Sequence, residues 1–140
     1  MKELRQEPTP VSLIQGLEEQ ADDPRFKSLM DVHFSSTLPF DLELEPVETT
    51  HILAISSEAL SNAARHAQAR KVELGAGVEN GRLTITITDN GRGFQEKGAS
   101  GGYGLRNMRD RARLLGGELT IASNPGQGTT ITLTVPLEEE

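Results

Sequence analysis

Four polar side chains on one predicted helix have the chemistry needed to act on a phosphate ester. They are spaced i, i+4, i+7 and i+8, so they project from one stripe of the helix. An amide oxygen can ligate Mg²⁺, a cation can meet a phosphate, and a carboxylate can act as a base or orient a nucleophile. Taken alone, the stripe also fits a solvated helix face with a charge pair. The four residues are Glu58, Asn62, Arg65 and His66.

Two more polar residues share strand faces with apolar side chains. In LTITITD, residues 83–89, Asp89 has the parity of the leucine and isoleucines, and in TTITLTV, residues 129–135, Thr129 has the parity of the apolar set. An inward carboxylate needs a partner. Beside an inward hydroxyl, it could bind the polar edge of a heterocycle held in an apolar pocket. For Asp89 alone, a turn or helix cap before Asn-Gly is the competing interpretation.

The segment DNGRGFQEKGASGGYGL, residues 89–105, concentrates glycines directly after the first of these strands. Glycines let the backbone approach a ligand closely, and Gly104 leads into a predicted helix whose free N–H groups favour an anion. The segment contains neither a G-x-x-x-x-G-K-[ST] phosphate loop nor a dinucleotide fingerprint. On its own it therefore also fits a flexible surface loop. The glycines concerned are Gly91, Gly93, Gly102 and Gly104.

The elements that must position these residues are helices and paired strands. Apolar residues at three- and four-residue steps predict the helices, and alternation with turn signals such as Asn80-Gly81 predicts the strands. Helices are expected at about 10–20, 47–67 and 104–117, and strands within 28–38, 70–90 and 118–136. Because hairpins dominate, the predicted fold class is α+β. It is a two-layer α/β sandwich whose mixed, mostly antiparallel sheet carries helices on one face.

The composition limits the class of protein. The chain has 140 residues, which corresponds to one domain. Its net charge of −7 argues against a nucleic-acid partner. The absence of cysteine rules out disulfides and thiolate metal sites, and it fits a cytoplasmic location. The three histidines lack zinc-ligand spacing, and no apolar run is long enough to predict membrane contact.

Four motifs, taken in order, resemble the N, G1, G2 and G3 boxes of the GHKL (Bergerat-fold) ATP-binding domain. They are EALSNAARHA, DNGRGF, GGYGLRNM and GQGTTITLTVP. Histidine kinases, gyrase-type topoisomerases, heat-shock chaperones and mismatch-repair ATPases share this domain. The chain is most similar to the catalytic and ATP-binding domain of bacterial sensor histidine kinases, in the subfamily paired with LuxR-type response regulators. The resemblance is strong over about 38–136 and weak before it.

The resemblance implies how the chain would bind its cofactors, ATP and Mg²⁺. Asp89 would read the adenine amino group, and Thr129 would support it through its hydroxyl or a water. Asn62 would hold the Mg²⁺ that bridges the phosphates, with Arg65 and His66 nearby. The remaining nucleotide-binding residues would be Gly91, Gly93, Gly102, Gly104 and Leu105.

The resemblance also implies phosphoryl transfer from ATP to a histidine nitrogen, with Glu58 assisting the attack on the γ-phosphate. Such kinases carry the acceptor histidine on a dimerisation helix in an LHD-like context, which the histidines here lack. We therefore expect residues 1–140 to form a single catalytic domain, with its boxes within 58–135 and without the phosphoacceptor domain. Its partners would be that domain and, through the full-length protein, a response regulator. The alternatives are an anti-sigma-factor-type serine kinase and a non-catalytic module in which nucleotide controls assembly.

Overall fold

The computed structural model describes residues 12–65, 67–93 and 103–137. The helices are α1 (Leu13–Ala21), α2 (Pro24–Lys27), α3 (Pro46–Arg65) and α5 (Tyr103–Leu114). The strands are β1 (Asp31–Ser36), β2 (Lys71–Glu79), β3 (Arg82–Asp89), β4 (Glu118–Ser123) and β5 (Thr129–Pro136).

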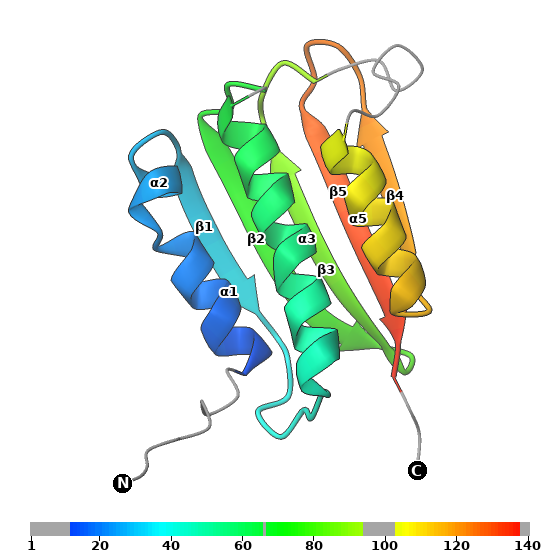
Figure 1. Cartoon of the computed structure of the whole chain (residues 1–140). Helices are drawn as coiled ribbons and strands as arrows, with labels where there is room; N and C mark the ends of the chain where they lie inside the picture. Colours follow the sequence, from blue (N-terminus) through cyan, green and yellow to red (C-terminus); the bar gives the residue numbers. More distant parts are fainter. Residues whose placement is uncertain (1–11, 66, 94–102, 138–140) are drawn as a thin grey trace, which may run out of the picture.

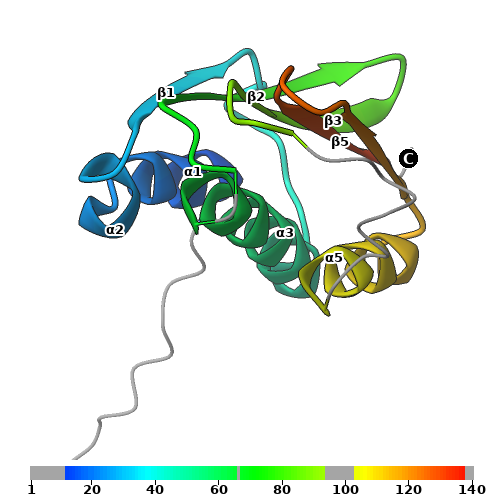
Figure 2. The same ribbon diagram turned by 90° about the horizontal axis from the view of Figure 1, so that it is seen from above.

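The strands form one sheet in the order β1-β2-β3-β5-β4. β1 pairs with β2 in parallel, and the other neighbouring strands pair antiparallel. Figure 1 shows the helices lying across the sheet, and Figure 2 shows that they all cover the same face. The predicted two-layer α+β sandwich is confirmed.

Strand parity determines which side chains meet the helices. On β3 the side chains of Leu83, Ile85 and Ile87 are buried, whereas the threonines between them lie on the other face and are more exposed. β5 repeats this pattern. From the helical layer, α3 contributes the buried residues Ile52, Ile55, Ala59, Leu60 and Ala63. The core is therefore aliphatic and lies between the layers, as the composition predicts.

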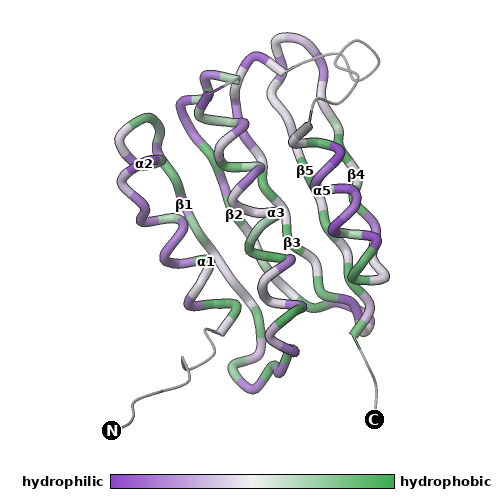
Figure 3. The backbone as a smooth tube through the Cα atoms, viewed as in Figure 1, coloured by the Kyte–Doolittle hydropathy of each residue, from purple (hydrophilic) through white to green (hydrophobic). Residues whose placement is uncertain are grey.

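The polar residues of the helices lie mainly on the side that faces away from the sheet. The outer side of α5 carries the exposed side chains of Arg106, Asp110 and Arg113, and much of this helix is coloured hydrophilic in Figure 3. Toward the sheet, the same helix buries Met108 and Ala112. Within the part of the chain that the structure describes, no helix combines the length and hydropathy needed to cross a membrane.

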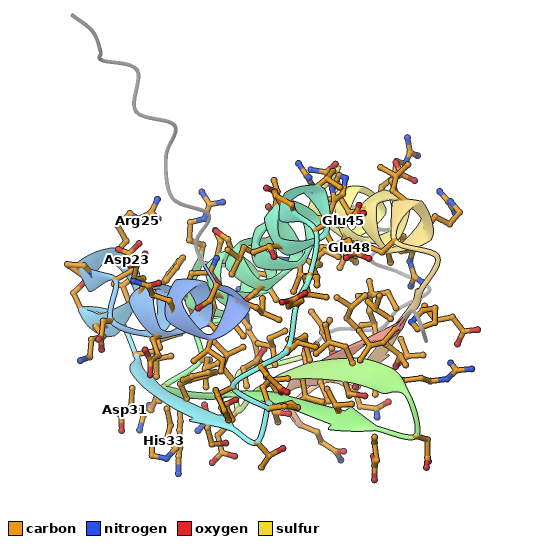
Figure 4. The ribbon with its side chains drawn as sticks, turned by 90° about the horizontal axis from the view of Figure 1, so that it is seen from below. Asp23, Arg25, Asp31, His33, Glu45 and Glu48 are labelled. Carbon is orange, nitrogen blue, oxygen red and sulfur yellow. The ribbon has the colours of Figure 1, made fainter. Side chains whose placement is uncertain are left out.

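The short helix α2 was not predicted from the sequence. Asp23 precedes it as N-cap, with Pro24 at its first position. The Asp23 carboxylate accepts a hydrogen bond from the Arg25 backbone at 2.9 Å and also pairs with the Arg25 guanidinium (Figure 4). An N-cap aspartate followed by proline is a recognised start signal. The turn after α2 continues to Met30, whose amide donates to the Phe26 carbonyl, so the strand predicted within 28–38 begins only at Asp31.

The other expected elements are present with small shifts of their ends. α1 begins after the N-cap Ser12, so positions 10 and 11 of the predicted helix lie outside the described residues. α3 ends at Arg65 and α5 at Leu114, slightly earlier than predicted. Asn80 and Gly81 both have positive φ, 54° and 74°, as the predicted hairpin turn requires.

Candidate functional site

The end of α3 and the loop after β3 are joined by backbone contacts at the upper end of the sandwich in Figure 1. The Arg92 amide donates to the Ala67 carbonyl at 3.0 Å, and the Gly126 amide donates to the Arg92 carbonyl at 2.5 Å. A Cβ on Gly91 would lie 2.5 Å from Cβ of Ala67 and 2.6 Å from its carbonyl oxygen. Glycine at position 91 therefore allows the loop to contact the end of α3 directly.

Asp89 and Thr129 face each other across β3 and β5, where their Cα atoms are register partners. Thr129 is only 7% exposed, and Asp89 is partly buried. Burial raises the pKa of Asp89, while hydrogen bonds from the Gly91 and Thr129 backbone act against that rise. The bond from the Gly91 amide to Asp89 Oδ1 is 2.8 Å long. The inward placement predicted from parity is confirmed, and the pair offers an acceptor and a hydroxyl beside an apolar core.

Glu58 lies against the first turn of α5. A Cβ built on Gly104 would overlap with Glu58 Oε2 and lie 3.0 Å from Cδ. With glycine at position 104, the carboxylate occupies this space without having to shift. The N-terminal end of a helix carries a partial positive charge that favours an anion. The structure thus brings the carboxylate predicted on α3 into contact with the glycine predicted at the start of α5.

Asn62 and Arg65 follow Glu58 by one and two turns of α3. The Asn62 side chain is partly buried, whereas Arg65 is exposed. Among the described residues, no group of three or more histidine and acidic side chains could hold a metal ion. The donor that the sequence assigns to Mg²⁺, the Asn62 amide oxygen, is of the type this ion prefers when phosphates and water supply the other ligands. The residues present therefore fit Mg²⁺ that arrives with a nucleotide.

The remaining predicted site residues fall into two groups. His66 and Gly102 lie outside the described residues. Gly93 has φ of +67°, and a Cβ there would collide with the Asn124 carbonyl, so it fits the loop against the turn before β5. Leu105 is partly buried and packs against the hydrophobic core.

Ser123 joins this end of the sheet without having been predicted. Its Oγ lies 2.8 Å from Thr129 Oγ1 and 3.2 Å from the Gly128 carbonyl oxygen. The strand ELTIAS places Ser123 on the same face as Leu119 and Ile121, both of which are buried. This parity was the available signal in the sequence.

Residues 48–139 match the family model of histidine kinase-, DNA gyrase B- and HSP90-like ATPases. Among curated proteins, the chain is 35% identical to sensor histidine kinase LiaS of Bacillus subtilis over 129 residues, covering 91% of this chain and 35% of LiaS. It is 37% identical to sensor histidine kinase YdfH of the same species over 127 residues, covering 83% of this chain and 31% of YdfH. The chain thus spans about a third of the length of these relatives.

Solved structures show the same fold. The histidine kinase domain of the blue-light activated histidine kinase of Erythrobacter litoralis EL346 superposes with a TM-score of 0.75 at 23% identity, over 94% of this chain and 66% of that one. Another structure of that kinase gives 0.73 at 27% identity, over 86% of this chain and 40% of that one. The family match covers more than half of the chain. This chain belongs to the family of histidine kinase-, DNA gyrase B- and HSP90-like ATPases.

Proposed function

We propose that this chain is the ATP-binding catalytic domain of a sensor histidine kinase. It would transfer the γ-phosphate of ATP to a histidine on a separate dimerisation domain. The observation that carries the proposal is the contact of the Glu58 carboxylate with Gly104, at the same end of the fold as the Asp89–Thr129 pair. A carboxylate and a heterocycle-binding pair at one end suit a nucleotide that lies between them. The likeness to LiaS and YdfH supports the same reaction class.

Asp89 would accept a hydrogen bond from the adenine amino group. Its carboxylate has more acceptor positions than the backbone donors use. The buried side chains of Ile87 and Ile131 lie next to it along the two strands and supply apolar surface. Thr129 would contribute its hydroxyl beside the same edge of the base.

Asn62, Arg65 and Glu58 would serve the phosphate end. Mg²⁺, when bound, neutralises charge on the phosphates, and the Asn62 amide oxygen would hold it. Arg65 is exposed near the end of α3, where it can pair with a phosphate. Glu58 would orient the attacking imidazole or accept its proton. Most of the catalysis would be positioning and charge neutralisation.

The proposed partners follow from this reaction. The phosphoacceptor histidine would belong to a dimerisation domain of the same kinase, and a LuxR-type response regulator would take the phosphoryl group from the full-length protein. Because ATP is the donor, we propose a cytoplasmic site of action.

The nucleotide site is tested by Asn62→Asp and Asp89→Asn. Both should abolish Mg-ATP binding in calorimetry and leave the circular dichroism spectrum unchanged. Asn62→Asp places a negative charge beside the phosphates, and Asp89→Asn replaces an acceptor oxygen with an amide nitrogen that donates; both side chains are partly buried. If both variants bind Mg-ATP with wild-type affinity, the site assignment is wrong.

The catalytic role is tested by Glu58→Gln. This variant should still bind Mg-ATP, but its phosphotransfer to an added histidine-bearing dimerisation domain should fall by roughly 10²- to 10⁴-fold. Glu73→Gln, an exposed position on β2, is the matched control and should transfer normally. Full transfer by Glu58→Gln refutes its role.

A further inference from the structure

Ser123 and Thr129 form a hydrogen-bonded pair of hydroxyls beside Asp89. The two oxygens are 2.8 Å apart, and Ser123 Oγ donates to the Gly128 carbonyl oxygen at 3.2 Å. β4 and β5 place these residues opposite each other, as register partners. Thr129 in turn faces Asp89 on β3. Three neighbouring strands thus bring a serine, a threonine and an aspartate into one row.

The single proton on each hydroxyl determines the direction of this network. A carbonyl oxygen can only accept, so the Ser123 hydrogen that points to Gly128 is not available to Thr129. The short contact between the hydroxyls therefore takes its hydrogen from Thr129. With its own hydrogen directed at Ser123, the Thr129 oxygen has only lone pairs left for a ligand.

We infer that Ser123 is a positioning residue that fixes the Thr129 hydroxyl as an acceptor and so makes the site select a purine with a 6-amino group over one with a 6-oxo group. This inference rests on the proposed function, in which Asp89 binds the 6-substituent of the base. Register partners on antiparallel strands lie about 5 Å apart. A purine 6-substituent that is hydrogen-bonded to Asp89 is therefore within reach of Thr129, directly or through one water.

The selectivity follows from the two acceptors. The 6-amino group of adenine donates two hydrogens, and the Asp89 carboxylate and the Thr129 oxygen can both accept. A 6-oxo group brings lone pairs toward the same two acceptors, and neither of them can donate a hydrogen to it. Sites built to bind a donor reject an analogue that lacks it, because buried polar groups then lose their partners. Thr129 is 7% exposed, so bulk water does not compensate for that loss.

The test compares binding of ATP and inosine triphosphate, which differ at this edge of the base, to wild type and Ser123→Ala. In Ser123→Ala the Thr129 hydroxyl can rotate and donate to the 6-oxo group. We expect the affinity ratio of ATP to inosine triphosphate to fall roughly three- to tenfold, the effect of one hydrogen bond. Ser123→Thr keeps a hydroxyl and should restore the ratio. Ser123→Cys keeps the shape with a weaker acceptor and should lower the ratio even if Ser123→Ala does not fold.

A double-mutant cycle shows whether Ser123 acts through Thr129. In a Thr129→Val background, Ser123→Ala should leave the ratio unchanged. Thr120→Ala removes an exposed hydroxyl from the outer face of β4 and should behave as wild type. If Ser123→Ala weakens both nucleotides equally, or if the cycle is additive, the inference is overturned and the proposed function stands. If the wild-type protein binds neither nucleotide, the proposed function fails and the inference fails with it.

Discussion

At the scale of single residues, Asp89 is a carboxylate whose partial burial works against the stability of the fold. Its partial burial raises its pKa above the usual value of 3.8, so the folded protein binds the proton more tightly than the unfolded chain does. The free energy of unfolding must then fall as the pH rises from that value through the folded pKa. We expect Asp89→Asn to melt higher than wild type at pH 7 without nucleotide. The difference between the melting temperatures of Asp89→Asn and wild type should grow as the pH rises from the acid range. Thermal unfolding followed by circular dichroism measures this difference.

Asp31→Asn is the matched control for this experiment. Asp31 is exposed on the face of β1 that points away from the helices (Figure 4). For Asp31→Asn, the difference in melting temperature from wild type should not grow with pH in this way. If the difference in melting temperature between Asp89→Asn and wild type is constant with pH, or shrinks as the pH rises, then burial of the charged Asp89 carboxylate does not destabilise the fold.

At this scale the sequence predicts which face of a strand a side chain occupies, but it does not predict which side chains touch. Parity placed Asp89 and Thr129 on the inner face, and the structure confirms it. The pairing of Ser123 with Thr129 also depends on how β4 and β5 align around their turn, which parity does not fix. The contact between Glu58 and Gly104 depends on how two helices pack, although each residue was identified separately.

At the scale of elements, α3 buries a hydroxyl on its sheet-facing side. Ser56 is 0% exposed, and its Oγ has no hydrogen-bond partner within the described part of the chain. An unsatisfied buried polar group costs about 1–3 kcal/mol. We expect Ser56→Ala to raise the free energy of unfolding by about 1–2 kcal/mol, because it removes that cost and improves helix propensity. Urea denaturation is the measurement.

Ser57→Ala, one residue further along α3, separates the two contributions. Ser57 is only partly buried, so its variant should gain about 0.5 kcal/mol from propensity alone. If Ser56→Ala stabilises the protein no more than Ser57→Ala does, the buried Ser56 hydroxyl does not lower the free energy of unfolding.

Helices and strands could be predicted where the apolar pattern repeats over many residues. The 20-residue helix α3 and the hairpin of β2 and β3 follow from apolar spacing and from Asn80-Gly81. The four-residue helix α2 is too short to show a period, and its signal was local, in Asp23 and Pro24. The parallel pairing of β1 with β2 is a property of the assembled sheet, which the order of strands in the sequence does not specify.

At the scale of the whole molecule, Gly91 lies where the helical layer meets the sheet at the site end. A Cβ at this position would meet both the side chain and the backbone of Ala67, so neither neighbour can move aside cheaply. We expect Gly91→Ala to separate the end of α3 from the loop after β3. Overpacking should lower the free energy of unfolding by about 1–3 kcal/mol. Mg-ATP affinity should fall at least about tenfold, the equivalent of 1.4 kcal/mol, because Asn62 and Asp89 would no longer be held together.

Gly116→Ala shows whether lost stability alone explains that loss of affinity. Gly116 has φ of +69° with nothing within 4 Å of an added Cβ, so alanine there introduces backbone strain without a collision. That strain costs about 1–2 kcal/mol. Gly116 follows α5, at the end of that helix opposite Gly104, so nucleotide affinity should remain at the wild-type level. Calorimetric titration of both variants with Mg-ATP, alongside urea denaturation, gives the comparison. Equal loss of affinity in the two would mean that global stability, and not the junction at Gly91, keeps the site assembled.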